Sequence, residues 1–267
     1  MKLSVSTYSL SRWRQEEGKS VEQCLDWLAQ VGVEAVEFSG LGERPFADPI
    51  RRARALRKRC DRLGLKVAGY CVGAELLKPP AQQRQEIERL KQQVDVAAEL
   101  GAPSMRHDVT RGPAERKQRM SFPQVLRHVA PAVRQIADYA ASRGLTSSLE
   151  NHGFYLQTAD RIERLIKAVD HPNYALTLDL GNFLCLNQDP VEAARRLAPY
   201  AVMVHAKDFH VRPKRQVPPG LPEDAPAGIP RGSGWFETPT PIALRGAIAG
   251  HGQLDLPAQL QILRRAG

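Results

Sequence analysis

Seven strand-like segments alternate with helix-like segments along this chain, and this alternation constrains the fold more than any other feature. The strand-like segments are short and mostly apolar, and lie at 2–7, 33–38, 66–71, 103–106, 146–150, 174–179 and 201–205. Strands joined through helices must pair in parallel, because a parallel connection needs a long crossover. Seven such units in succession favour a (β/α) barrel over an open sheet, the more so because the first turn lacks the GxGxxG phosphate loop of doubly wound folds.

The helix-like segments carry recognisable start and stop signals. Ser20 with Gln23, and Ser121 with Gln124, have the spacing of capping boxes. Glycines follow the apolar stripes of several helices, where they favour termination. The expected helices lie at about 20–32, 48–63, 81–100, 121–144, 158–169, 190–199 and 255–266.

The chain of 267 residues suits a single α/β domain, 1–267. Its Pro/Gly-rich stretch at about 209–252 is too long for a plain connector, so we expect a loop that acts as a lid or an interface. A final helix follows, and the sequence stops at Gly267, where an eighth strand would begin. We therefore expect a barrel whose eighth strand is absent from this chain, and a natural polypeptide that continues further.

Composition limits the classes of protein. Hydrophobic residues at 42% and charged residues at 25% indicate a globular chain. The four cysteines are scattered without a CxxC pair, which argues against a cysteine zinc site and fits a reducing compartment. The N-terminus is too polar for a signal peptide, and no apolar run reaches the ~18 residues of a membrane helix, so we expect a cytoplasmic protein without a membrane partner.

The net charge of +9 is concentrated in the basic helix, which carries seven Lys and Arg residues between positions 51 and 62. At helical spacing these side chains favour a solvated helix surface. Attraction of an anionic ligand, such as a sugar phosphate or a nucleic acid, is the alternative.

Three residues that bind metals well stand at the ends of three successive strands: Glu150, Asp179 and His205. The working residues of a (β/α) barrel lie at the C-terminal ends of its strands. Two carboxylates and an imidazole suit Mn²⁺, Mg²⁺, Co²⁺ or Zn²⁺. Each residue alone could be a helix cap or a turn former. Glu150 and Asp179 both follow apolar strands, however, where burying an unpaired carboxylate is costly, and a shared cation would offset that cost.

Four segments resemble the motifs of the sugar phosphate isomerase/epimerase family, the xylose isomerase-like TIM barrels: SLENHGF (148–154), LTLDLGNF (176–183), VHAKDFH (204–210) and GHGQLDLPAQLQIL (250–263). The resemblance implies one divalent metal, with Glu150, Asp179 and His205 as three ligands. The family's fourth ligand is a Glu of the eighth strand, and no residue of this chain corresponds to it.

The resemblance also implies an enzyme, a metal-dependent isomerase or epimerase that acts on a sugar, a sugar phosphate or a related keto-polyol. Its reaction is proton transfer next to a carbonyl, with Glu150 as the catalytic base. Several members have a histidine at the position of Asn182, so this chain departs from the ketose 3-epimerases. A related lyase or dehydratase that acts on a keto-sugar or a cyclitol is the alternative.

Six residues near these motifs are candidates for substrate binding: His152, Asn182, Lys207, His107, His251 and Trp13. Each also has a structural explanation. His152 could bond the loop backbone, Lys207 could pair with Asp208, and Trp13 could simply pack in the core.

Two functions of other classes compete with the isomerase. An apurinic-site endonuclease shares this barrel, but its three-metal cluster needs more His and Glu residues at strand ends, which argues against a nucleic-acid partner. The other alternative is an inactive or partnered subunit. In that case another chain would cover the gap that the absent eighth strand leaves, and a homo-oligomer is one such arrangement.

Overall fold

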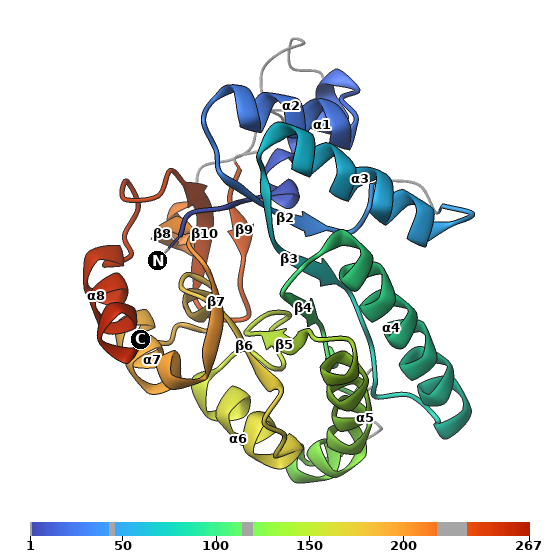
Figure 1. The fold of residues 1–267 in the computed structure, drawn as a ribbon. Coiled ribbons are helices and arrows are strands. Elements are labelled where there is room, and N and C mark those ends of the chain that lie inside the picture. The colour runs from blue at the N-terminus through green and yellow to red at the C-terminus, as the bar shows by residue number, and fades with distance from the viewer. Residues whose placement is uncertain (1, 43–45, 114–119, 218–233) are drawn as a thin grey trace. The chain divides into compact units, whose positions relative to one another are not determined.

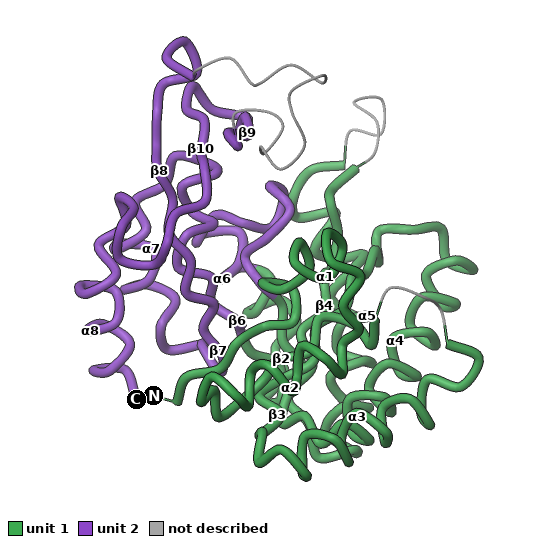
Figure 2. Tube along the Cα trace, turned by 90° about the horizontal axis from the view of Figure 1, so that it is seen from above, with its two compact units in different colours: residues 1–149, 165–175 green, residues 150–164, 176–267 purple. Residues whose placement is uncertain are grey.

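The computed structural model describes residues 2–42, 46–113, 120–217 and 234–267. The chain divides into two compact units, which Figure 2 shows in green and purple. Unit 1 comprises residues 1–149 and 165–175, and unit 2 comprises residues 150–164 and 176–267. In the described part of the chain, no helix is long and apolar enough to cross a membrane.

Unit 1 is built on parallel strands that pair in chain order. They are β1 (Val5–Ser6), β2 (Ala35–Ser39), β3 (Lys66–Val72), β4 (Ser104–His107) and β5 (Thr146–Glu150), whose last residue belongs to unit 2. Each strand hydrogen-bonds to the next, from β1 with β2 to β4 with β5. The expected strands are confirmed in this unit, and their order is that of consecutive β/α units.

The helices of unit 1 are α1 (Ser11–Glu17), α2 (Val21–Gln30), α3 (Pro49–Leu63), α4 (Pro80–Leu100) and α5 (Phe122–Ser142). Both expected capping boxes form, at the starts of α2 and α5. The sequence did not predict α1, because this short helix buries no residue and therefore has no apolar stripe.

Neighbouring helices of unit 1 pack against each other in the order α2, α3, α4, α5. The largest fully buried side chains of this core include Leu25, Leu28, Phe38, Leu56, Leu90, Met105 and Ile136. Burying each such side chain contributes about 1.5–3 kcal/mol. The basic helix α3 buries Ala53, Leu56 and Cys60, and most of its arginines are exposed, where Arg54 pairs with Glu99 and Arg57 with Asp61. This is the solvated charged surface that the sequence favoured.

Unit 2 continues the same pattern with β6 (Tyr174–Asp179), α7 (Pro190–Leu197), β7 (Ala201–His205) and α8 (Leu256–Ala266). The helix α6 (Ala159–Val169) precedes β6, and its first residues belong to this unit. Strands β6 and β7 are parallel, and their register pairs Leu178 with Val204 and Asp179 with His205. The register therefore sets two of the candidate ligands side by side.

The described part of 209–252 is not the loop that the sequence predicted. It contains β8 (Asp208–Pro213), β9 (Phe236–Glu237) and β10 (Ile242–Ala247), which form an antiparallel sheet in the order β8-β10-β9 (Figure 1). Residues 218–233 lie outside the described residues. These strands were not predicted because prolines and glycines interrupt the short apolar runs, and because the paired residues of β8 and β10 are 29 to 39 positions apart in the sequence. A role as lid or interface stays a prediction.

Candidate metal centre

Glu150, Asp179 and His205 come together at the strand ends of unit 2. One ligand atom from each residue lies within 4.8 Å of the other two. His205 Nδ1 is 3.3 Å from Glu150 Oε1. Asp179 is fully buried, Glu150 is 9% exposed and His205 is partly exposed. The three side chains that the sequence placed on separate strands thus form one cluster.

Asn151 fixes the end of β5 to the end of β6. Its Oδ1 accepts a hydrogen bond from the amide of Asp179 at 2.8 Å, and its Nδ2 donates to the carbonyl oxygen of Asp179 at 2.9 Å. Asn151 is fully buried, so both bonds are shielded from water. The side-chain amide of Asn151 therefore binds the backbone that carries Asp179.

The two carboxylate oxygens of Asp179 have different environments. Oδ1 accepts hydrogen bonds from the amides of Gly181 at 2.9 Å and Asn182 at 2.8 Å. Oδ2 is buried, and Lys207 Nζ lies 2.8 Å from it as the partner ammonium group. The turn after β6 therefore holds one oxygen in place and leaves the other for a cation.

Asn182 connects the proposed base to the neighbouring ammonium group. Its Nδ2 donates to Glu150 Oε1 at 3.3 Å, and its Oδ1 accepts from Lys207 Nζ at 3.2 Å. Gly181 makes room for the stem of Lys207, since a Cβ at this position would lie 2.6 Å from Lys207 Cγ. Both Asn182 and Lys207, expected from the sequence as substrate-binding residues, thus lie beside the cluster.

Burial and charge act in opposite directions on these groups. Burial raises the pKa of Asp179 and the Glu150 carboxylate adds to this, whereas the Lys207 ammonium opposes it. Burial lowers the pKa of Lys207, but the attraction of Asp179 and Glu150 outweighs burial and raises it overall. The cluster therefore holds the carboxylates of Asp179 and Glu150 in a buried site, where a nearby cation is strongly favoured.

A divalent cation fits this donor set. Two carboxylates and an imidazole match the ligands of Mn²⁺, Zn²⁺ and related metals. The buried Oδ2 of Asp179, to which the amides of the turn do not bind, is the oxygen that a metal could take over from the Lys207 ammonium. Three protein ligands are also the number that catalytic zinc sites use, which leaves positions for substrate.

The glycine-rich turn 250–252 is held by Asp208, which the sequence proposed only as a partner of Lys207. The Asp208 carboxylate accepts hydrogen bonds from the amides of Phe209, Gly250, Gly252 and Leu254 at 2.7–3.1 Å. Burial acts to raise the pKa of Asp208, but these four bonds outweigh it and hold the pKa below its ordinary value. The signal for this role is an Asp followed 42 residues later by a Gly-x-Gly turn.

The other predicted substrate-binding residues have separate surroundings. His251 and His152 are both exposed side chains of unit 2. Trp13 lies in unit 1 on α1, where its ring centroid is 5.4 Å from that of Trp27, which is a packing contact. His107 is fully buried in unit 1, its Nε2 is 3.1 Å from Ser147 Oγ, and burial lowers its pKa. Their contacts with substrate stay predictions.

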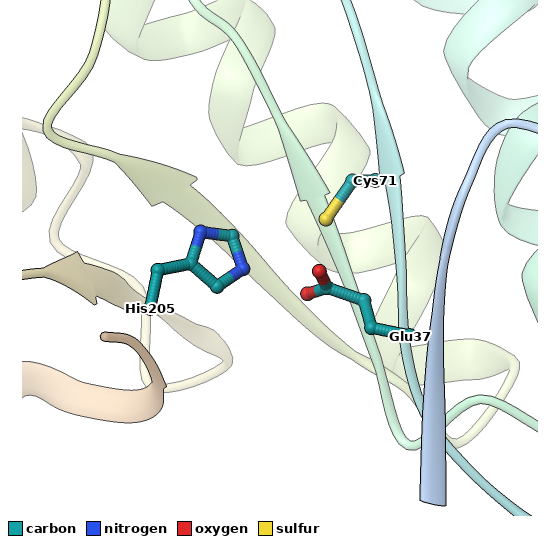
Figure 3. A group of neighbouring side chains, drawn as sticks. All are labelled: Glu37, Cys71 and His205. Atoms are coloured by element: carbon teal, nitrogen blue, oxygen red, sulfur yellow. The ribbon is translucent and has the colours of Figure 1, made fainter. Parts of the chain in front are cut away.

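Unit 1 contains a buried carboxylate that was not among the residues predicted from the sequence. Glu37 on β2 is 2% exposed, and one of its oxygens lies within 4.8 Å of Cys71 Sγ on the neighbouring strand β3 (Figure 3). The signal was a Glu inside the apolar strand VEAVEF, where a charged side chain is unexpected.

Comparison with known proteins supports this reading of the fold. The family model of xylose isomerase-like TIM barrels matches residues 25–267, and the chain belongs to this family. The expected fold class, a TIM barrel of the xylose isomerase-like kind, is confirmed.

Two named enzymes and one solved structure are similar to this chain over most of its length. The chain is 27% identical to a 2-epi-5-epi-valiolone 7-phosphate 2-epimerase of Actinoplanes sp., over 96% of this chain and 93% of that protein. It is 24% identical to an inosose dehydratase of Geobacillus kaustophilus, over 70% of this chain and 61% of that protein. The crystal structure of the IolI protein with a bound zinc atom superposes with a TM-score of 0.71 at 16% identity, over 100% of this chain and 86% of that one.

Proposed function

We propose that this protein is a metal-dependent isomerase or epimerase that acts on a sugar, a sugar phosphate or a related keto-polyol by proton transfer next to a carbonyl. The observation that carries the proposal is the convergence of Glu150, Asp179 and His205, whose ligand atoms lie within 4.8 Å of one another. The similarity to an epimerase over nearly the full length of both proteins supports the reaction class.

The three clustered residues would hold the metal. A divalent ion bound there polarises a carbonyl oxygen and lowers the barrier for removal of the adjacent proton. Manganese, magnesium, cobalt and zinc all suit this donor set, and the zinc-bound IolI structure supports a metal in this fold.

The protein's own side chains would perform the proton transfer and orient the substrate. Glu150 accepts the proton from the substrate carbon, because it is a carboxylate that is 9% exposed at the edge of the cluster. Asn182 holds Glu150 Oε1 through its Nδ2 and thereby aims the base. Lys207 supplies an ammonium group that can bind a hydroxyl, carbonyl or phosphate oxygen of the substrate.

Dehydration is the second candidate, because an inosose dehydratase is among the similar proteins. Its first step is the same proton abstraction, and a neighbouring hydroxyl then leaves as water. The two reactions are separated by their products, since an epimerase conserves the substrate mass and a dehydratase lowers it by one water.

The test is deuterium exchange in heavy water, with ketoses, inosose-like cyclitols and keto-glycosides as substrates and with Mn²⁺ present. Wild-type protein should introduce deuterium at the carbon next to the carbonyl. Glu150→Gln should lose this exchange while it keeps the fold. Glu163→Gln is the matched control, because Glu163 pairs with Arg196 on the helical side of unit 2. Near-normal exchange by Glu150→Gln would exclude Glu150 as the base.

A further inference from the structure

Lys207 occupies the oxygen that a metal at the proposed centre would need. Both hydrogen bonds to Asp179 Oδ1 come from backbone amides, so this oxygen is committed to the turn after β6. The other oxygen, Oδ2, is buried and is paired with Lys207, whose Nζ lies 2.8 Å away. Metal and ammonium therefore compete for the same atom.

The two cations cannot share this oxygen without strong repulsion. Metal–oxygen distances are about 2.0–2.6 Å. With the ammonium 2.8 Å from Oδ2 on its other side, the two positive charges would be no more than about 5 Å apart in a buried site. An unpaired buried carboxylate is also costly, so Asp179 needs one of the two cations at all times.

The surroundings of Lys207 offer the ammonium a second partner. Asn182 Oδ1 already lies 3.2 Å from Nζ, so the group keeps a hydrogen bond when it leaves Asp179. Its side chain is partly exposed at 37%, which gives the ammonium a path toward solvent or substrate.

We propose that Lys207 neutralises Asp179 in the metal-free protein and is displaced from it when a divalent cation binds, which frees the ammonium for an oxygen of the substrate. This inference rests on the proposed metal centre. It adds that the Lys207 ammonium group occupies the metal-binding oxygen of Asp179 in the metal-free protein. Metal binding and substrate binding are therefore linked through Lys207.

The first experiment measures Mn²⁺ affinity by titration calorimetry on the full chain. Lys207→Met should bind Mn²⁺ at least about tenfold more tightly than wild type, because the competing charge is gone. Lys214→Met is the control, since Lys214 pairs with Glu237 at 3.3 Å. Unchanged or weaker binding by Lys207→Met would overturn the inference.

A second variant distinguishes displacement of the Lys207 side chain from removal of its positive charge. Gly181→Ala keeps the ammonium but places a methyl group 2.6 Å from Lys207 Cγ and 3.1 Å from Phe209 Cε2, so the stem of Lys207 must move and the contact between its ammonium group and Asp179 should weaken. The backbone at Gly181 has φ −98° and ψ −25°, a conformation that alanine adopts without strain. Gly181→Ala should also bind Mn²⁺ more tightly, whereas Gly246→Ala, with no atom within 4 Å of the added Cβ, should not. Wild-type affinity in Gly181→Ala would contradict displacement.

Chemical labelling reports the movement directly. Limited acetylation followed by peptide mass spectrometry should show that Lys207 becomes more reactive when Zn²⁺ or Mn²⁺ is added, while Lys214 does not. Equal or lower reactivity of Lys207 would reject the displacement. Asp179→Asn distinguishes this result from failure of the centre itself. If wild type binds no metal, or if Asp179→Asn binds it equally well, the proposed centre and the inference both fail.

Discussion

The carboxylate of Asp208 lies directly against the backbone of Gly252. The amide of Gly252 donates to Asp208 Oδ2 at 2.7 Å, and a Cβ on Gly252 would lie 2.1 Å from Oδ1. The same carboxylate binds the amides of Gly250 and Leu254. One side chain at the start of β8 thus holds the segment that leads into α8.

Gly252→Ala should destabilise the protein by about 1–3 kcal/mol, the usual cost of forcing extra volume into a packed site. The added Cβ would also lie 2.7 Å from the carbonyl oxygen of Phe209, which belongs to the backbone and cannot swing away. Urea unfolding measures the change in free energy. Gly246→Ala on β10 is the matched control and should stay within about 0.5 kcal/mol of wild type.

Asp208→Asn should be destabilising although the two side chains have nearly the same shape. Aspartate accepts from two amides on each oxygen, whereas an asparagine turns one NH₂ group toward two backbone donors. Each donor left without a partner costs about 1–3 kcal/mol. Hydrogen exchange should show faster exchange of the amides of Gly250, Gly252 and Leu254. Wild-type protection of all three would contradict the assigned role.

Asn151→Leu should weaken metal binding without removing a ligand. The substitution leaves the amide and the carbonyl of Asp179 without their partner at the end of β6. We expect Mn²⁺ affinity to fall by about 10–100-fold, as for other residues that orient metal ligands. Calorimetric titration measures the loss. Gln135→Leu, an exposed amide on α5, is the control that should bind Mn²⁺ like wild type.

The pair of Glu22 and Arg52 should make stability depend on pH in the acid range. The hydrogen bond from Arg52 lowers the pKa of Glu22 from 4.5 to about 2. Because the folded pKa lies below the unfolded one, the contribution of the pair is complete above about pH 4.5 and is lost as the pH falls toward 2.

Urea unfolding of wild type and Glu22→Gln at several pH values tests this dependence. The stability advantage of wild type should be constant above pH 4.5 and shrink below it. Glu88→Gln, on the exposed face of α4 beside Lys91, is the control for general charge loss. An advantage that persists unchanged down to pH 2 would refute the assigned interaction.

Local sequence patterns were sufficient to predict the parallel strands and most helices. The capping boxes at Ser20 and Ser121 formed because they depend on atoms only three residues apart. The same local reasoning missed α1, which has no buried face, and the strands β8 and β10, whose pairing partners are distant in the sequence.

The sequence by itself determined which residue types end the strands, and thus which three residues could act as metal ligands. Strand periodicity and the position of each polar residue after an apolar run carry that information. Only the tertiary structure decided how they meet. The register that pairs Asp179 with His205, the clamp of Asn151 on Asp179 and the position of Lys207 on Oδ2 join residues that are 26 to 28 positions apart. Such contacts arise from the packing of strands and turns in space, and no local pattern encodes their distances.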